Sequence, residues 1–492
     1  MREWLAIYWP YLSGGVAFAA AMATAGHALL HKREVRASIG WVGLILFVPL
    51  LGALLYGLLG INRIRRRAVA LRRQQTRQRP PRPQPAVKRQ TVLERFGRSR
   101  ADLAGAIGRI TEAPLLADNT VECLDGGDET YPVMLSAIEG AQRSISLTTF
   151  IFDNDALGAR FADALTEARG RGVEVRVLID AAGVRYTRPP IHGPLRRAGV
   201  PTALFLLLAL TRALHLNLRS HRKALIIDGR RAFCGGMNIR AGHLLRGGPL
   251  LAAEELRPPR QQIRDLHFDL EGPVVGQLQE VFADDWAFAH GERLEGETWF
   301  PELDRSPHGG VLARAIADGP DADLDRLQWS LLTALASARE SVRIVTPYFL
   351  PEQPLVSALN AAALRGVEVD IVVPEEGNLR LVALAMWAQF WRVLRHEGCR
   401  LWLTPPPFDH SKLFIVDGEW TLFGSTNWDP RSLRLNFELN VEAYDRALAK
   451  HLTAEADRRI SEARQLTREE LEGLSLPRRL RDGLARLLSP YL

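Results

Sequence analysis

The sequence predicts a duplicated α/β domain with a pseudo-twofold axis, preceded by two transmembrane helices. Three observations carry this prediction: two uncharged segments near the N-terminus, a repeated order of elements, and a repeated motif of His, Lys and Asp. With 492 residues, of which 47% are hydrophobic, the chain is long enough for more than one domain and for buried cores. The composition therefore excludes a disordered protein.

Residues 1–62 are predicted to form the two transmembrane helices. Residues 4–30 and 37–61 are almost free of charge, and each segment is long enough to cross the hydrocarbon core of a bilayer. Trp9 and Tyr11 in the first segment, and Trp41 and Tyr56 in the second, suit interfacial anchoring. A cleaved signal peptide is an alternative for the first segment, although its basic start is minimal and a second apolar segment follows at once. A hairpin that does not fully cross the membrane is a further alternative.

Residues 63–108 are interpreted as a basic Arg/Pro-rich linker, extended and disordered between residues 72 and 90. Residues 61–100 hold thirteen Arg and one Lys against one Glu, so the rest of this chain of net charge +7 is acidic. A basic strip beside a membrane segment indicates anionic lipid headgroups as partners rather than nucleic acid. The strip outweighs the basic loop at residues 31–36, so the positive-inside rule places the remainder of the chain in the cytoplasm.

The remainder divides into two halves, residues 109–305 and 306–492. Gly172-Val173-Glu174-Val175 returns as Gly366-Val367-Glu368-Val369, and each half is predicted as helix, strand, helix, strand and then a motif strand. A repeat of this period indicates a duplicated α/β domain whose twofold axis brings the two motifs together. Residues 205–210 are predicted as a strand or a membrane-dipping loop, and the C-terminal stretch as an amphipathic helix that lies on a membrane or packs on the domain.

Each half carries one copy of the pattern His-x-Lys-x4-Asp. The copies are His221, Lys223 and Asp228 in the first half, and His410, Lys412 and Asp417 in the second. Each copy runs into an apolar stretch and a small-residue turn that ends in Asn, at Asn238 and Asn427. Two copies with matching continuations favour function over chance.

These residue types suit attack on a phosphodiester, an anion with a poor leaving group. One His can attack phosphorus while the other donates a proton to the leaving oxygen. Lys223, Lys412 and the amides of Asn238 and Asn427 would stabilise charge in the transition state. In a strand, His and Lys two residues apart point to the same face. The arrangement requires no metal and no cofactor.

The remaining candidates have structural interpretations. Asp228 and Asp417 belong to the motif, but each precedes a Gly, and we favour a turn that closes the motif strand. Cys123, Cys234 and Cys399 are far apart in the sequence and show no metal-ligand spacing, so they are interpreted as buried thiols in a reducing compartment.

Together these motifs resemble the phospholipase D superfamily and, within it, the bacterial cardiolipin synthases. The resemblance covers nearly the whole chain outside the linker, and it extends to residues 346–351, 424–432 and 436–438 and to the two N-terminal segments. It implies phospholipase D-type α/β halves, with Glu438 as an acid that orients a catalytic His. Asp265 is the corresponding acid of the first half, with Asp269 as a rival.

The resemblance also implies the reaction. A phosphatidyl group would pass from one phosphatidylglycerol to another through a phosphatidyl-histidine intermediate, with His221 as nucleophile by family analogy. A phospholipase D that hydrolyses lipid to phosphatidic acid, a membrane-tethered nuclease and a lipid-binding scaffold are the alternatives. The sequence leaves the oligomeric state open.

Overall fold

The computed structural model describes residues 2–32, 35–57, 86–205, 218–246, 250, 262–302, 310–320, 323–394 and 398–489. The chain divides into two compact units, Met1–Ala70 and Leu71–Leu492. Each unit is described by itself below.

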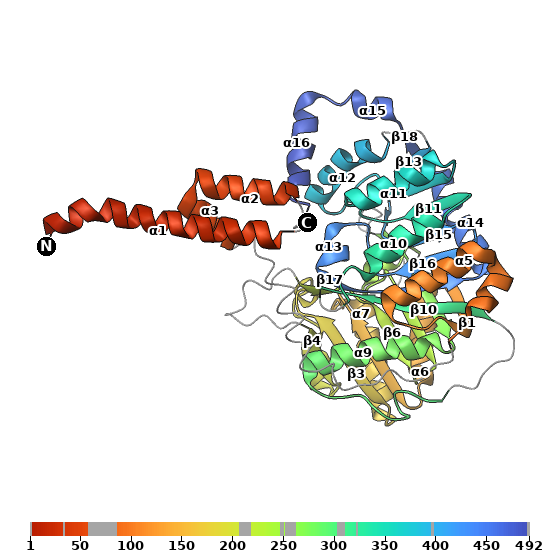
Figure 1. The fold of residues 1–492 in the computed structure, drawn as a ribbon. Coiled ribbons are helices and arrows are strands. Elements are labelled where there is room, and N and C mark those ends of the chain that lie inside the picture. The colour runs from red at the N-terminus through yellow and green to blue at the C-terminus, as the bar shows by residue number, and fades with distance from the viewer. Residues whose placement is uncertain are drawn as a thin grey trace. The chain divides into compact units, whose positions relative to one another are not determined.

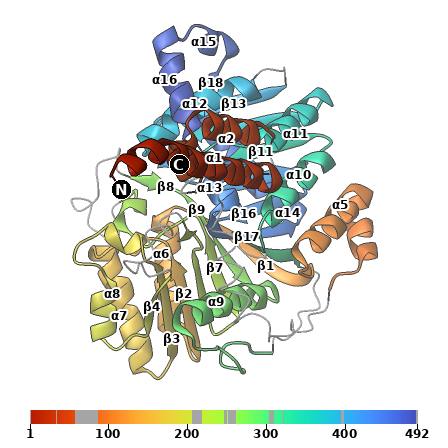
Figure 2. The same ribbon diagram turned by 60° about the vertical axis from the view of Figure 1, so that its left-hand side comes forward.

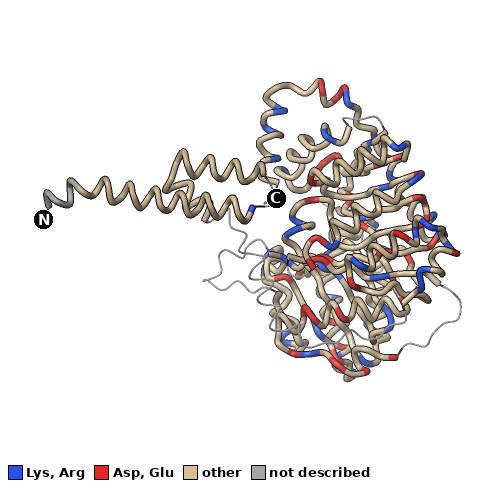
Figure 3. The backbone as a smooth tube through the Cα atoms, in the orientation of Figure 1, with Lys and Arg blue, Asp and Glu red and all other residues tan. Residues whose placement is uncertain are grey.

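The N-terminal unit is built from three helices: α1 (Arg2–His31), α2 (Val35–Phe47) and α3 (Pro49–Leu55). Alanines at positions 21, 25 and 28 share one face of α1 and are buried against Ile45 and Tyr56. The outer residues are large, apolar and exposed, among them Trp9, Leu30 and Phe47. Figure 3 shows that the described part of these three helices is almost free of charged residues. A helical unit with so much exposed apolar surface is typical of a protein in lipid.

The expectation of two transmembrane helices is met only in part. Among the residues that the structure describes, one helix is long and apolar enough to cross a membrane, over residues 11–31. The second apolar segment is interrupted where Val48 leaves the helical conformation, with φ −135°, and Pro49 starts α3. Proline has no N–H to continue the hydrogen bonding of the preceding turn. Residues 58–61, the end of this predicted span, lie outside the described residues.

The predicted linker extends too far along the chain. Residues 89–108, assigned to it above, belong to helix α5 (Arg89–Thr111), which bends at Gly97 with φ +80°. The helix buries Val92, Leu103 and Ile107 in the core of the larger unit. This part of the chain is helical because apolar residues recur there at helical spacing. Most of the basic strip, including residues 63–85, lies outside the described residues.

A sixteen-stranded sheet runs through the described part of the larger unit (Figure 1). Fifteen strands follow one path, and the sixteenth, β5 (Arg219–Ser220), pairs with β17 (Asn436–Tyr444) off that path. The strands of the first half follow the spatial order β1 (Leu116–Asp125), β9 (Leu266–Glu271), β7 (Arg231–Gly235), β6 (Ala224–Ile227), β2 (Ser144–Thr149), β3 (Glu174–Asp180) and β4 (Thr202–Phe205). The second half follows β10 (Val311–Asp318), β17 (Asn436–Tyr444), β16 (Trp420–Gly424), β15 (Leu413–Val416), β11 (Ser341–Val345), β12 (Glu368–Pro374), β13 (Cys399–Thr404) and the edge strand β18 (Arg464–Leu466). The halves join where β1 pairs antiparallel with β10.

Helices cover both faces of the sheet (Figure 2). In the first half, α6 (Gly127–Gly140), α7 (Ala156–Gly170) and α8 (His192–Arg197) pack on one face and α9 (Val274–His290) on the other. In the second half, α10 (Arg326–Ser337), α11 (Gln353–Leu364) and α12 (Arg380–Val393) lie opposite α14 (Arg446–Glu462). The core beneath α9 and α14 is continuous across both halves.

The repeated sequence signals have the expected local structures. Gly172 and Gly366 lie at the turns between a helix and the next strand, with φ of +92° and +88°, values that favour glycine. Asp155 caps α7 and Asp445 caps α14, each accepting a backbone N–H three residues on. The predicted α/β class is confirmed. Phe205 ends β4, and residues 206–210 of the apolar run lie outside the described residues.

Candidate active site

The two motifs lie at short strand pairs between the halves. In the first motif, β5 (Arg219–Ser220) pairs in parallel with β17 of the second half, and the His221 N–H donates to the Phe437 carbonyl at 2.9 Å. In the second motif, β14 (Phe408–Asp409) pairs in parallel with β8 (Ile263–Arg264) of the first half, and the His410 N–H donates to the Arg264 carbonyl at 2.7 Å. Each motif is therefore positioned by the opposite half.

The His and Lys precede the motif strands rather than lying within them, because β6 begins at Ala224 and β15 at Leu413. The expectation from period-two geometry is wrong in this detail. Each Lys instead folds back, so that Lys223 Nζ donates to the His221 carbonyl at 2.7 Å and Lys412 Nζ donates to the His410 carbonyl. Both ammonium groups still lie beside their own His.

Glu438 holds the histidine of the first motif. His221 Nδ1 lies 3.1 and 3.0 Å from the two Glu438 carboxylate oxygens, and Glu438 is fully buried. The carboxylate also accepts hydrogen bonds from the Ser425 hydroxyl and from Asn436 Nδ2, the latter at 3.0 Å. With Nδ1–H bonded to Glu438, the Nε2 lone pair of His221 is directed away from the carboxylate.

Asp265 holds the histidine of the second motif. Its Oδ2 atom lies 2.8 Å from His410 Nδ1, while Oδ1 accepts the Leu266 N–H at 2.9 Å. A Cβ at Gly236 would lie 2.4 Å from the Asp265 carboxylate, so glycine at this position leaves room for the acid. Asp269, the rival from the sequence, instead pairs with Arg231. Each orienting acid thus comes from the half that does not carry its histidine.

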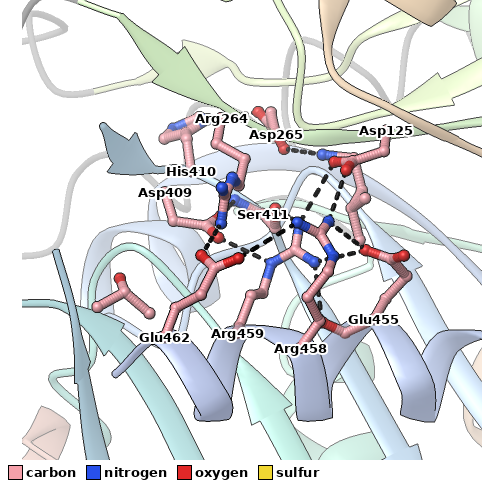
Figure 4. Close-up of polar contacts among 12 residues, drawn as sticks. Asp125, Arg264, Asp265, Asp409, His410, Ser411, Glu455, Arg458, Arg459 and Glu462 are labelled. Atoms are coloured by element: carbon pink, nitrogen blue, oxygen red, sulfur yellow. Dashed lines mark hydrogen bonds and ion pairs between the residues drawn. The ribbon is translucent and has the colours of Figure 1, made fainter. Parts of the chain in front are cut away.

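A buried ion network supports the second motif (Figure 4). Arg459 of α14 donates to Asp409, the residue before His410, at 2.8 Å and also contacts Ser411 and Glu455. In the first half, Arg222 of the motif donates to Asp285 of α9 at 2.7 and 2.6 Å. Both networks tie a motif to a helix on the same face of the sheet. In the first half the motif supplies the arginine and the helix supplies the aspartate, whereas in the second half the helix supplies the arginine.

Burial governs the ionisation of the two motifs. It lowers the pKa of His221, and it lowers the pKa of His410 well below its usual value with the help of the positive charges of Lys412 and Lys223. Burial also lowers the pKa of Lys223 to about 7 and that of Lys412 to about 8, although Glu438 and Asp265 oppose this. The pKa of Lys223 is further lowered by Lys412, so the two motifs share one electrostatic environment.

The motif aspartates lie at the far ends of the motif strands. Asp228 accepts the backbone N–H groups of residues 142–144, and Asp417 accepts those of residues 339–341 and pairs with Arg100. Both have positive φ, 54° and 52°, and each precedes a glycine with positive φ. These contacts agree with a structural role in closing the turn.

The two asparagines differ in their contacts. The Asn238 carboxamide oxygen accepts the Ile151 N–H at 3.0 Å, which fixes that side chain. The Asn427 carboxamide oxygen is buried and makes no hydrogen bond with the described residues. Asn427 thus keeps polar capacity that a ligand can use.

Several neighbours of the site were given no role in the sequence analysis. The ring centroids of Phe150 and His221 are 5.5 Å apart, and those of Tyr348 and His410 are 6.3 Å apart. Ser425, Asp285 and Arg459 bond directly to site residues or to their neighbours in the motif. Tyr348 and Ser425 belong to segments that carry the resemblance, whereas Phe150, Asp285 and Arg459 lie outside those segments and show no pattern of their own.

Comparison with known proteins places this geometry in a family. The family described as cardiolipin synthase, PLD-like domain, matches residues 134–247 and 331–460, and the family described as phospholipase D-nuclease N-terminal matches residues 19–60. The major cardiolipin synthase ClsA of Bacillus subtilis is 32% identical over 94% of this chain and 95% of its own length. Cardiolipin synthase A of Pseudomonas entomophila is 31% identical, with 98% and 99% covered. The chain belongs to the cardiolipin synthase family of phospholipase D type.

Membership of the cardiolipin synthase family identifies the chain as a phosphatidyltransferase of phospholipid synthesis, associated with membranes. A solved structure, phosphatidylserine synthase of Haemophilus influenzae, aligns with a TM-score of 0.61 at 15% identity, covering 80% of this chain and 100% of that one. This likeness shows a shared fold.

Proposed function

We propose that the chain transfers a phosphatidyl group from one phosphatidylglycerol to the free hydroxyl of a second, giving cardiolipin and glycerol. The observation that carries the proposal is the exchange of acids between the halves, which holds two His-Lys motifs in one buried environment where Lys412 lowers the pKa of Lys223. The phosphatidylglycerol specificity comes from the family.

In the proposed first step, His221 Nε2 attacks phosphorus and the bond to the glycerol oxygen breaks. His410 supplies the proton to that oxygen, and glycerol leaves. In the second step, His410 takes the proton of the incoming lipid hydroxyl, whose oxygen attacks phosphorus and displaces His221. Both histidines then return to their starting states.

The electrostatics support this sequence of steps. His221 is neutral at neutral pH, because burial lowers its pKa, and a neutral imidazole is the form that can attack. A bound phosphodiester is negative, so its arrival raises the pKa of His410, Lys223 and Lys412 and favours their protonated forms. The substrate itself therefore prepares the general acid. Lys223, Lys412, Asn238 and Asn427 are the proposed contacts of the non-bridging oxygens.

The competing proposal is hydrolysis, with water as the acceptor and phosphatidic acid as the product. Incubation with labelled phosphatidylglycerol in vesicles, followed by separation of the lipids, distinguishes the two. We expect cardiolipin and free glycerol in equal amounts. Phosphatidic acid as the main product would replace the transferase with a phospholipase D.

A variant series tests the catalytic groups. We expect His221→Ala and His410→Ala each to abolish turnover in a folded protein, because each removes one partner of the proton and phosphoryl transfer. His451→Ala is the control, since that histidine is exposed on α14. Denaturation with SDS at mildly alkaline pH during turnover should leave labelled phosphatidyl on His221, because the N–P bond is labile in acid. Near-normal turnover by either motif variant contradicts the two-histidine mechanism, and label on His410 reverses the two roles.

We further propose that the two halves are related by a pseudo-twofold axis and that the larger unit lies in the cytoplasm against the bacterial inner membrane. The shared strand order supports the axis. The excess of arginine after the apolar segments supports the placement through the positive-inside rule. Anionic phospholipids are the expected partners of that strip, and no nucleic acid is expected. An accessibility assay on intact cells that finds the larger unit outside the cytoplasm contradicts the topology.

A further inference from the structure

Helix α16 (Leu476–Leu487), near the C-terminus, presents a stripe of leucines to solvent. Leu476, Leu480, Leu484 and Leu487 are 66%, 59%, 65% and 69% exposed. They recur every three or four residues and therefore share one face of the helix. Scattered surface leucines are ordinary, but a continuous row of this kind marks an interaction surface.

The opposite face of α16 already packs on the larger unit. Asp482 and Ala485 are buried there, and the Arg478 guanidinium stacks over the Trp387 ring of α12 at 4.9 Å. This packing fixes the rotation of the helix and directs the leucines outward. The sequence left two interpretations of this segment open: a helix that packs on the domain, and a helix that lies on a membrane. The structure assigns the packing to one face of α16 and leaves the other face exposed.

The leucine stripe continues onto α12. A groove between the two helices is lined by Leu381, Leu384, Leu480, Leu484 and Leu488, and Leu381 is itself 50% exposed. Leu379, at the N-cap of α12, is 52% exposed. The apolar surface therefore extends over two helices.

Arginines border the stripe on one side, where helical spacing places Arg479 and Arg486, and blue positions mark this helix in Figure 3. On the other side Arg481 lines the groove and pairs with Asp482 at 2.7 Å. An in-plane membrane helix combines an apolar face with flanking arginines, which is the pattern of α16. The same chain also carries an N-terminal helix that is long and apolar enough to cross a membrane, so a lipid surface is within reach of the protein. The charges match anionic headgroups.

We propose that the leucine face of α16, extended by α12, is a membrane-docking surface that inserts among the acyl chains of an anionic bilayer, with Arg479 and Arg486 at the headgroups. This contact with lipid is additional to any contact that the N-terminal unit makes with a membrane. It brings the larger unit itself to the lipid surface. The surface does not depend on which histidine attacks or on whether the acceptor is lipid or water.

The first test measures where this face lies in the full chain. Leu484→Cys and Leu364→Cys, in a Cys123→Ser background, carry the same environment-sensitive fluorophore. Leu364 ends α11 and is a matched control, because it is 68% exposed. The protein is reconstituted in vesicles of phosphatidylglycerol and phosphatidylcholine that contain a spin-labelled quencher lipid. We expect strong quenching at position 484 and little at position 364.

Two results would overturn the proposal. Equal quenching at both positions means that this face does not meet lipid preferentially. A fluorophore at position 484 that is shielded from both the lipid quencher and a water-soluble quencher means that protein covers the face, from a second copy or from another part of the chain.

The second test separates docking from chemistry. We expect Leu480→Glu with Leu484→Glu to lower turnover of phosphatidylglycerol in vesicles by about tenfold or more, because two leucines no longer enter the bilayer. Turnover of a short-chain phosphatidylglycerol, kept monomeric in solution, should equal that of the unmodified chain. Leu364→Glu should change neither rate.

An equal loss on both substrates, or no loss on vesicles, contradicts the docking surface. If the unmodified chain itself turns over neither substrate, the proposed function fails, and the quenching test still decides on the surface.

Discussion

The exchange of acids between the halves can be tested with Glu438→Gln. The substitution keeps the size of the side chain but removes the charge that meets His221 Nδ1 at 3.0 and 3.1 Å. Loss of charge-assisted hydrogen bonds to a buried group costs about 2–4 kcal/mol. In a rate this corresponds to about 30- to 900-fold, at 1.36 kcal/mol for each factor of ten. The expected loss is in kcat, because the carboxylate orients the attacking imidazole rather than the lipid.

Glu442→Gln is the matched control, because Glu442 lies on the same strand four residues on, is equally buried and pairs with Arg314 and Trp420 instead of a histidine. It should lower the free energy of unfolding without lowering kcat of the folded protein. The assay is the initial rate of cardiolipin formation at saturating phosphatidylglycerol, with folded protein measured by near-UV circular dichroism. A Glu438→Gln enzyme within about threefold of the unmodified rate, or one no slower than Glu442→Gln, refutes the assigned role.

Three further predictions follow from the site. The kcat/KM profile against pH should be bell-shaped: activity rises as His221 loses its proton below its usual pKa of about 6.5, and falls as the proton donor His410, and then Lys223 and Lys412 near pH 7 and 8, lose theirs; activity that keeps rising above pH 8 contradicts this. Arg459→Met should lower the free energy of unfolding, measured by urea titration, by about 3–5 kcal/mol, since Asp409 is left as an unpaired buried charge. Adding Asp409→Asn should restore part of that loss. Equal stability of the single and double variants contradicts the pairing. EDTA should leave the rate of cardiolipin formation unchanged, because lysines and amides supply the positive charge and donors; loss of activity that one divalent ion restores counts against this.

The order of helices and strands along each half could be predicted from the sequence, because each helix or strand depends mainly on the residues within it and next to it. Apolar runs at residues 224–227 and 413–416 became β6 and β15, and Gly172 and Gly366 mark the turns expected of them. Both orienting acids were named from the resemblance. Which histidine each acid serves was not predictable, because the contacts join residues 217 and 145 positions apart and depend on two-residue strand pairs too short to show a period.

The errors also have local causes. A hydropathy window over residues 37–61 averages across Pro49, whose missing N–H ends the helical pattern at Val48. The Arg/Pro-rich composition before residue 89 hid the apolar face of α5, which begins directly after it. Composition describes a stretch of chain, whereas helix formation depends on spacing.

The exchanged acids have a consequence for the origin of this chain. A single half contains a histidine and an acid, but they serve different sites, so one half alone cannot build either pair. An ancestor with one half would have worked as a dimer of identical subunits, each lending its acid to the other. Fusion of two such copies would remove the need for them to stay identical. The two pairs do differ, since Glu438 accepts from Ser425 on one side while Asp265 lies against Gly236 on the other.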